Sequence, residues 1–108
     1  MLKINILNVD NKKIPFPEVY QHRIQTAVRL LKNAGAKKIY LFGSLVRGEI
    51  TNSTDIDIGI QGLAPEIFFR VFDQLSEAVD SPLDLVDFDE QIDFFKMLDS
   101  VEEVIQIE

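Results

Sequence analysis

The sequence contains no cysteine, which excludes a disulfide framework and a zinc site built from thiolates. No apolar run is long enough to cross a membrane, and the first residues lack the apolar segment and cleavage pattern of a signal peptide. We therefore expect a cytoplasmic protein with no membrane partner. Histidine occurs once, as His22, without an acidic or nucleophilic companion at a recognisable spacing. We interpret it as an exposed helix residue and not as a catalytic base.

Basic residues are too few and too scattered to form a nucleic-acid-binding surface. The 108 residues include 11 Lys and Arg against 18 Asp and Glu, which gives a formal net charge of −7. Because extended contact with a phosphate backbone relies on concentrated Lys and Arg, contact with nucleic acid is disfavoured. The length and the 46% hydrophobic content predict a single domain over 1–108 with a modest core.

The spacing of apolar residues predicts alternating helices and strands along most of the chain. Helical periodicity predicts helices at 18–33, 65–79 and about 90–98. Short β-rich runs predict strands at 38–42, 55–60, 83–86 and 104–107. The first seventeen residues predict a short strand around 2–7 or an irregular arm, ended by Asp10-Asn11 and two prolines. The fold class is therefore α/β (α+β), a small mixed β-sheet with helices packed on it.

Five phenylalanines lie in the two predicted helices that follow the strand at 55–60. Helical spacing places most of them in the core, but Phe69 and Phe94 fall off the main apolar stripes. We expect these two side chains at the surface, where one of them marks a candidate protein interface.

A small-residue turn, Gly43-Ser44, follows the predicted strand at 38–42, and a short helix is expected after it. Glycine lets the backbone approach a phosphate closely, and the start of a helix offers unpaired N–H groups to an anion. A Gly-Ser pair by itself is ordinary turn punctuation. Its position before the carboxylates described next makes it a candidate phosphate-binding turn.

Two carboxylates, Asp55 and Asp57, are one residue apart on the next predicted strand. Side chains alternate along a strand, so both project from one face while the isoleucines that alternate with them are buried on the other. Asp84 interrupts a third, otherwise apolar strand. If the two strands are neighbours, the three carboxylates converge, and their mutual repulsion requires a cation. Oxygen ligands of this kind favour Mg²⁺.

These segments together resemble the nucleotidyltransferase superfamily that includes DNA polymerase beta, and most closely its minimal stand-alone members. The resemblance rests on Gly43-Ser44, Arg47-Gly48, Asp55-Ile56-Asp57 and Leu83-Asp84-Leu85-Val86-Asp87. It implies the polymerase beta-like nucleotidyltransferase fold, two Mg²⁺ ions and ATP as substrate.

The resemblance also implies a role for each matching residue. Gly43 and Ser44 would grip the triphosphate. Asp55 and Asp57 would bind both metals, and Asp84 would complete the metal site and help to position the attacking hydroxyl. These three aspartates are the predicted catalytic residues and metal ligands.

Arg47 occupies the position at which the family often carries a basic residue that contacts phosphate, and we predict that it binds the nucleotide. The alternative is a surface ion pair with Glu49, which would contribute little energy. Thr54 stands where relatives usually have serine, so a hydroxyl is retained. Asp87 and Asp89 are interpreted as a strand residue and helix caps, not as metal ligands.

Minimal members of this kind are typically encoded beside HEPN-domain proteins, and some act as antitoxins that transfer AMP from ATP to a tyrosine of that toxin. The resemblance therefore implies an antitoxin that is a protein adenylyltransferase, in a hetero-oligomer with a HEPN-domain partner. A chain of 108 residues leaves little room for a separate acceptor domain, which agrees with a partner that supplies the acceptor.

Two alternatives stay open. The chain is a non-catalytic antitoxin subunit that neutralises its partner by binding alone. Otherwise it adenylylates a small cationic molecule such as an aminoglycoside, which its negative charge would attract. The second alternative requires a homodimer around the substrate.

Overall fold

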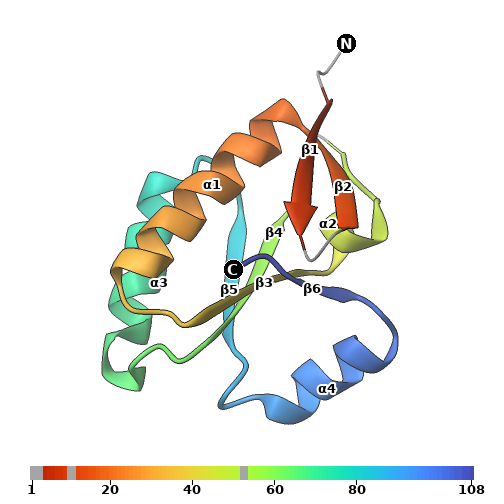
Figure 1. The fold of residues 1–108 in the computed structure, drawn as a ribbon. Coiled ribbons are helices and arrows are strands. Elements are labelled where there is room, and N and C mark those ends of the chain that lie inside the picture. Colours follow the sequence, from red (N-terminus) through yellow and green to blue (C-terminus); the bar gives the residue numbers. More distant parts are fainter. Residues whose placement is uncertain (1–3, 10–11, 52–53) are drawn as a thin grey trace.

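A computed structural model describes residues 4–9, 12–51 and 54–108 of the chain. Its elements in chain order are β1 (Ile4–Val9), β2 (Lys12–Pro17), α1 (Glu18–Asn33), β3 (Lys38–Phe42), α2 (Ser44–Arg47), β4 (Ile56–Gln61), the 3₁₀ helix η1 (Pro65–Ile67), α3 (Phe68–Ala78), β5 (Leu83–Asp87), α4 (Ile92–Ser100) and β6 (Val104–Gln106) (Figure 1). Within these described residues, no helix is long and apolar enough to span a bilayer.

The central sheet has four strands in the order β5-β4-β3-β6. β4 and β5 run parallel, whereas β3 is antiparallel to both of its neighbours, so the sheet is mixed as predicted. The parallel pair is connected through α3, as a parallel connection requires a crossover. α1 and α3 lie beside one another on one face of this sheet, while α4 lies apart from them near β6 (Figure 1).

Alternation along the strands divides the core between the two faces of the sheet. On β3, Ile39 and Leu41 pack under α1 and α3, while Tyr40 and Phe42 pack with α4 on the opposite face. The larger cluster combines residues of α1, α2 and α3 with one face of the sheet and with loop residues that follow β4 and α3. Its buried members are Tyr20, Ile24, Ala27, Leu31, Ile39, Leu41, Leu45, Ile56, Ile58, Ile60, Leu63, Val71, Leu75, Val79 and Leu85. The smaller cluster is aromatic and is centred on Phe88, which is fully buried.

The N-terminal segment differs from the prediction. In place of one strand or an irregular arm, β1 and β2 form an antiparallel hairpin in which Ile4 pairs with Pro17 and Val9 with Lys12. β2 contains two prolines, which normally argue against a strand. They are tolerated because, among the residues that the structure describes, β2 pairs with β1 alone, so a missing N–H breaks no second ladder. Residues 2–3 of the predicted strand and the Asp10-Asn11 pair lie outside the described residues.

Two helix starts also differ from the prediction. The helix expected from Pro65 begins as a 3₁₀ turn and becomes α-helical at Phe68. The last helix begins at Ile92 and not near Glu90, because the carboxylate of Asp87 accepts hydrogen bonds from the N–H groups of Asp89 and Glu90 and holds a turn there. Asp87 therefore shapes the turn after β5, close to the capping role predicted for it.

The phenylalanine assignments are confirmed except at one position. Phe69 is 82% exposed, as its place off the apolar stripe predicts. Phe94, which was expected at the surface, is half-buried and lies edge-on to Phe42 with ring centroids 5.6 Å apart. It was misplaced because the aromatic cluster under α4 extends further around that helix than its periodicity indicates.

Gly59 makes the aromatic cluster possible. A Cβ atom at this position would lie 2.0 Å from Cε2 of Phe88, a buried and rigid ring. We predict that Gly59→Ala lowers the free energy of unfolding by roughly 1–3 kcal/mol through overpacking, measurable as a lower urea midpoint. The same substitution in a Phe88→Leu background should cost less, since the clashing ring is gone. Equal costs in both backgrounds would contradict this account.

Candidate active site

The Gly43-Ser44 turn lies directly against the carboxylate of Asp57. β3 ends at Phe42, which is the register partner of Asp57 on β4, and Gly43 follows with φ of 75° and ψ of −144°. A Cβ atom on Gly43 would lie 2.3 Å from Oδ2 of Asp57. Only glycine fits here, both because of the positive φ and because of this contact. The predicted turn and the predicted carboxylate are therefore neighbours in space.

Asp57 is also the register partner of Asp84 on the parallel strand β5. Partners in register project from the same face, so these two carboxylates share the face that carries Phe42. Asp55 immediately precedes β4, which starts one residue later than predicted, and both Asp55 and Asp84 are exposed. The three aspartates thus gather at one end of two adjacent strands.

The electrostatics of Asp57 reflect this gathering. Burial raises the pKa of its carboxyl group, and the charges of Asp84 and Asp55 raise it further, from an ordinary 3.8 to about 6. The guanidinium of Arg47 acts in the opposite direction and lowers this pKa. Asp57 is half-buried beside two like charges, which is a local cost that a bound cation would offset.

The carboxylates of Asp55, Asp57 and Asp84 are oxygen ligands that suit a hard divalent cation, although they do not surround a common point. Among the residues that the structure describes, no three acidic or histidine side chains form a ready metal-binding group. The carboxylate of Asp84 instead accepts a hydrogen bond of 3.0 Å from the N–H of Leu85. Mg²⁺ commonly takes one or two carboxylates and completes its shell with water and substrate phosphates, so Asp55, Asp57 and Asp84 are suitable ligands.

Arg47, the last residue of α2, lies at the rim of this site. Its Nη2 donates to Oγ of Ser44 at 3.2 Å, which ties the arginine to the turn. Its other contacts are ion pairs with Glu49 at 3.3 Å and with Glu103 at 3.9 Å. The arginine side chain is 37% exposed, so these pairs are weak and exchange easily for another anion. The ion pair with Glu49, given as the alternative, is therefore present. Nucleotide binding by Arg47 stays a prediction, and its hydrogen bond to Ser44 places it beside the turn.

A hydrogen-bond network that no sequence pattern predicted fixes the loop before Asp55. The hydroxyl of Tyr20 on α1 donates toward the carbonyl oxygens of Thr51 at 2.9 Å and Thr54 at 3.2 Å. Oγ1 of Thr54 accepts from the N–H of Thr51 at 2.6 Å and lies 3.4 Å from the carbonyl oxygen of Glu49. Thr54 is buried and directly precedes Asp55. The hydroxyl noted at position 54 therefore organises the loop that presents a predicted ligand.

The family model described as "Polymerase beta, Nucleotidyltransferase" matches residues 25–106, most of the chain and all six predicted site residues. The chain belongs to this nucleotidyltransferase family. Its mixed sheet with helices is the polymerase beta-like nucleotidyltransferase fold that the resemblance implied. No curated protein matches the chain.

Solved structures similar to this nucleotidyltransferase-family chain are toxin–antitoxin assemblies. One, a toxin–antitoxin with AMP-PNP, has 32% sequence identity and a TM-score of 0.50, over 63% of this chain and 56% of that one. Mutants of a toxin–antitoxin called MntA-HpeT have 29% and 33% identity with TM-scores of 0.49 and 0.48, over 58% and 63% of this chain and 55% of each of theirs. The chain thus spans little more than half the length of these structures.

Proposed function

We propose that the protein is a Mg²⁺-dependent nucleotidyltransferase that transfers AMP from ATP to a hydroxyl group of a partner protein. The observation that carries this proposal is the contact between the Gly43 backbone and Asp57, with Asp84 in register beside it, inside a nucleotidyltransferase-family domain. A turn that accepts phosphates and a set of carboxylates that accepts metal are thereby adjacent. This adjacency is what transfer of a metal-bound nucleotide requires.

Each residue has a defined task in the proposed reaction. Asp55, Asp57 and Asp84 hold Mg²⁺, with two ions expected, and Gly43 and Ser44 receive the triphosphate through the backbone. Arg47 leaves its weak ion pairs and contacts a phosphate oxygen. Bound Mg²⁺ supplies charge neutralisation for the triphosphate and lowers the pKa of an attacking hydroxyl.

The bond changes follow from these positions. The acceptor oxygen forms a bond to the α-phosphorus of ATP as the bond from that phosphorus to the pyrophosphate oxygen breaks. Asp84, at the exposed edge of the site, receives the proton of the acceptor hydroxyl. Pyrophosphate leaves with its charge neutralised, and AMP stays on the acceptor.

The partner we propose is a HEPN-domain toxin, with a tyrosine hydroxyl as acceptor and the present chain as antitoxin. The support is the likeness to a toxin–antitoxin structure that contains AMP-PNP, a non-hydrolysable ATP analogue. The exposure of Asp55 and Asp84 leaves space in front of the site for a residue of a partner.

The test is to incubate the protein with the proposed HEPN-domain partner, ATP and MgCl₂, and to measure the intact mass of that partner. We expect the partner to gain the mass of AMP, and we expect Asp57→Asn to abolish the gain. Neutralisation of the toxin by Asp57→Asn as effectively as by the wild type, with no gain in mass, would establish the non-catalytic antitoxin and contradict our proposal. AMP transfer to an aminoglycoside but not to the partner would also contradict it.

Tyr20 provides a separate prediction about the loop before Asp55. Tyr20→Phe removes the hydroxyl that bonds the carbonyl groups of Thr51 and Thr54. Because partners of a metal ligand affect metal affinity, the Mg²⁺ concentration for half-maximal transfer should rise by on the order of tenfold. The KM for ATP at saturating Mg²⁺ should change little, which distinguishes this effect from loss of nucleotide contacts.

Tyr40→Phe is the matched control for this prediction. The hydroxyl of Tyr40 donates to Oε1 of Gln61 at 2.7 Å, at the other end of the sheet. Its loss removes one tyrosine hydrogen bond without touching the loop. If both variants change the Mg²⁺ dependence equally, Tyr20 has no specific positioning role.

A further inference from the structure

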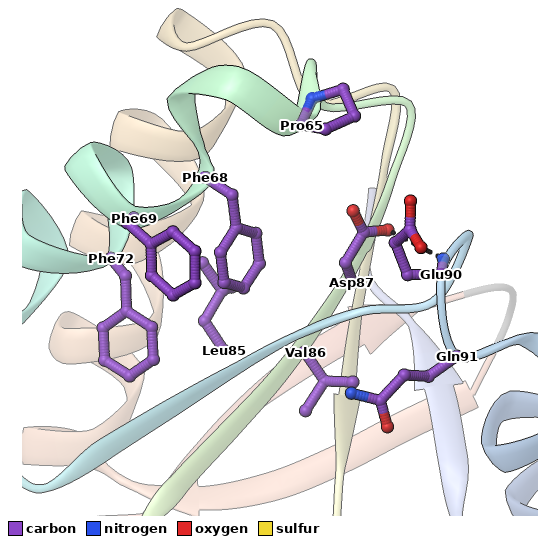
Figure 2. A pocket seen from close by; sticks show the side chains of 9 residues that line it. All are labelled: Pro65, Phe68, Phe69, Phe72, Leu85, Val86, Asp87, Glu90 and Gln91. Atoms are coloured by element: carbon purple, nitrogen blue, oxygen red, sulfur yellow. Dashed lines mark hydrogen bonds between the residues drawn. The ribbon is translucent and has the colours of Figure 1, made fainter.

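A second concave site lies at the opposite end of β5 from the catalytic aspartates. It is a cavity of about 470 Å³ lined by Pro65, Phe68, Phe69, Phe72, Leu85, Val86, Asp87, Glu90 and Gln91. The rings of the three phenylalanines stand on one side, and Asp87, Glu90 and Gln91 stand on the other (Figure 2). Asp87 is three residues beyond Asp84 on an extended strand, about 10 Å away. None of the proposed catalytic residues lines this cavity.

Asp87 is the unusual group in this cavity. Its side chain is only 9% exposed, yet no basic side chain pairs with it in the described part of the protein. Oδ1 accepts hydrogen bonds from the N–H groups of Asp89 and Glu90, at 2.9 and 3.4 Å. Within the described residues Oδ2 accepts no hydrogen bond, and the carboxylate faces the cavity (Figure 2). Oδ2 is open to the cavity, because in the described part of the protein Oε1 of Gln21 is the one buried side-chain oxygen or nitrogen without a hydrogen bond. A cationic group that enters the cavity can therefore form a charge-assisted hydrogen bond with Oδ2.

The three phenylalanines on the other side of the cavity provide aromatic rings that a cationic side chain can contact. Phe68 lies edge-on to both Phe69 and Phe72, with ring centroids 5.4 and 6.3 Å apart. Phe69 is 82% exposed, which leaves a large apolar ring in water unless something covers it. Aromatic rings attract a cation through their faces, and they also pack against the alkyl stem of a long basic side chain.

We propose that this cavity binds an arginine or lysine side chain from a partner protein, with an adjacent apolar residue of the same segment covering Phe69. The cationic head meets Asp87, Glu90 lies at the rim, and the alkyl stem lies against Phe68 and Phe72. A positively charged partner side chain is complementary to this protein, which carries a formal net charge of −7. The site serves docking and is separate from the transfer reaction.

The edge of β5 favours side-chain recognition over addition of a strand. The N–H of Phe88 points toward β4, where it bonds Ile60, so alternation directs the backbone groups of Leu85 and Asp87 away from β4. Two of these outward groups are already used. The N–H of Leu85 donates to the carboxylate of Asp84, and the carbonyl of Asp87 accepts from the N–H of Gln91. A partner strand would find an interrupted ladder, whereas the cavity remains available.

The test uses ¹⁵N-labelled protein and the acetylated, amidated peptide Ser-Leu-Arg-Leu-Ser, with titration followed by amide chemical shifts. We expect saturable shifts centred on Phe69, Asp87 and Gln91. The same peptide with norleucine or glutamate in place of arginine should bind at least tenfold more weakly, because the charge-assisted contact is lost. The experiment needs neither ATP nor metal, so it is independent of the proposed transfer reaction.

Variants locate the binding site. Phe69→Ala and Glu90→Gln change exposed side chains, and each should weaken the arginine peptide severalfold while the fold is retained. Asp87→Asn should weaken it most, with folding checked by its amide spectrum. Met97→Ala, which removes another exposed apolar side chain on α4, should leave binding unchanged. Equal affinity for the norleucine peptide, or shifts centred elsewhere, would overturn the proposal.

Discussion

We expect Asp57→Asn to abolish the proposed nucleotide transfer and to make the metal-free protein more stable at neutral pH. The carboxylate is half-buried beside Asp84 and Asp55, and these surroundings raise its pKa to about 6. Asparagine keeps the shape and removes the charge, so the repulsion disappears together with a metal ligand. Removing a residue that only hydrogen-bonds to a metal ligand already costs roughly 10–100-fold in activity. Removing the ligand itself should lower the transfer rate on the order of a hundredfold or more.

The stability gained by Asp57→Asn should depend on pH in a definite direction. The pKa of Asp57 is about 6 in the folded protein and near 3.8 when unfolded, so the folded state binds more protons between these values. Stability attributable to Asp57 therefore falls as pH rises from about 4 to about 6, and the full cost is present above that range. The advantage of Asp57→Asn should be largest at pH 7–8 and absent near pH 3.

The measurement is thermal unfolding in EDTA across this pH range. Asp73→Asn, which neutralises an exposed aspartate on α3, is the control for the change in net charge. Addition of Mg²⁺ and AMP-PNP should stabilise the wild type and the control but not Asp57→Asn. A pH-independent difference between Asp57→Asn and the wild type would contradict the predicted charge repulsion.

Gly43→Ala should be the most damaging single-methyl substitution in the site. The new Cβ would lie 2.3 Å from Oδ2 of Asp57, and the residue would have to hold a φ of 75°. The steric clash and the strained backbone both oppose folding, and each should lower the free energy of unfolding by roughly 1–3 kcal/mol. Relief of the clash would displace either the turn or the carboxylate, so transfer should be lost as well. Urea unfolding and the partner mass assay measure the two effects.

Gly48→Ala separates the two causes. Gly48 closes α2 with a φ of 80°, yet a Cβ there meets no atom within 4 Å. The cost of Gly43→Ala beyond that of Gly48→Ala therefore reports the contact with Asp57. In an Asp57→Ala background only the Cβ of that residue remains, 3.5 Å from the new methyl group, so the excess should vanish. A persistent excess would show that the turn is not packed against this carboxylate.

Most of the architecture could be predicted because local pattern and tertiary packing agree. β3 and α1 have the bounds that periodicity predicted, and the isoleucines of β4 are buried as alternation requires. The hairpin at the N-terminus could not be predicted, since prolines normally argue against strands and only the pairing with β1 accommodates them. Side-chain contacts between distant segments leave no local pattern either.

In the candidate site, too, some features follow from local sequence patterns and others depend on contacts between distant segments. Spacing was sufficient to bring Gly43, Asp57 and Asp84 together, because register follows once the strands are adjacent. The bonds from Tyr20 to a loop more than thirty residues away have no sequence signature. The cavity beside Asp87 was equally invisible, since a carboxylate at the end of a strand reads as a cap until its burial is known.

Calorimetric titration of AMP-PNP into the protein tests the central claim most directly, because it asks whether the three aspartates and the Gly43-Ser44 turn bind nucleotide and metal together. We predict saturable binding in excess Mg²⁺, none in EDTA, and none with Asp57→Asn in either condition. Binding that is equally tight in EDTA, or that persists unchanged in Asp57→Asn, would contradict the account.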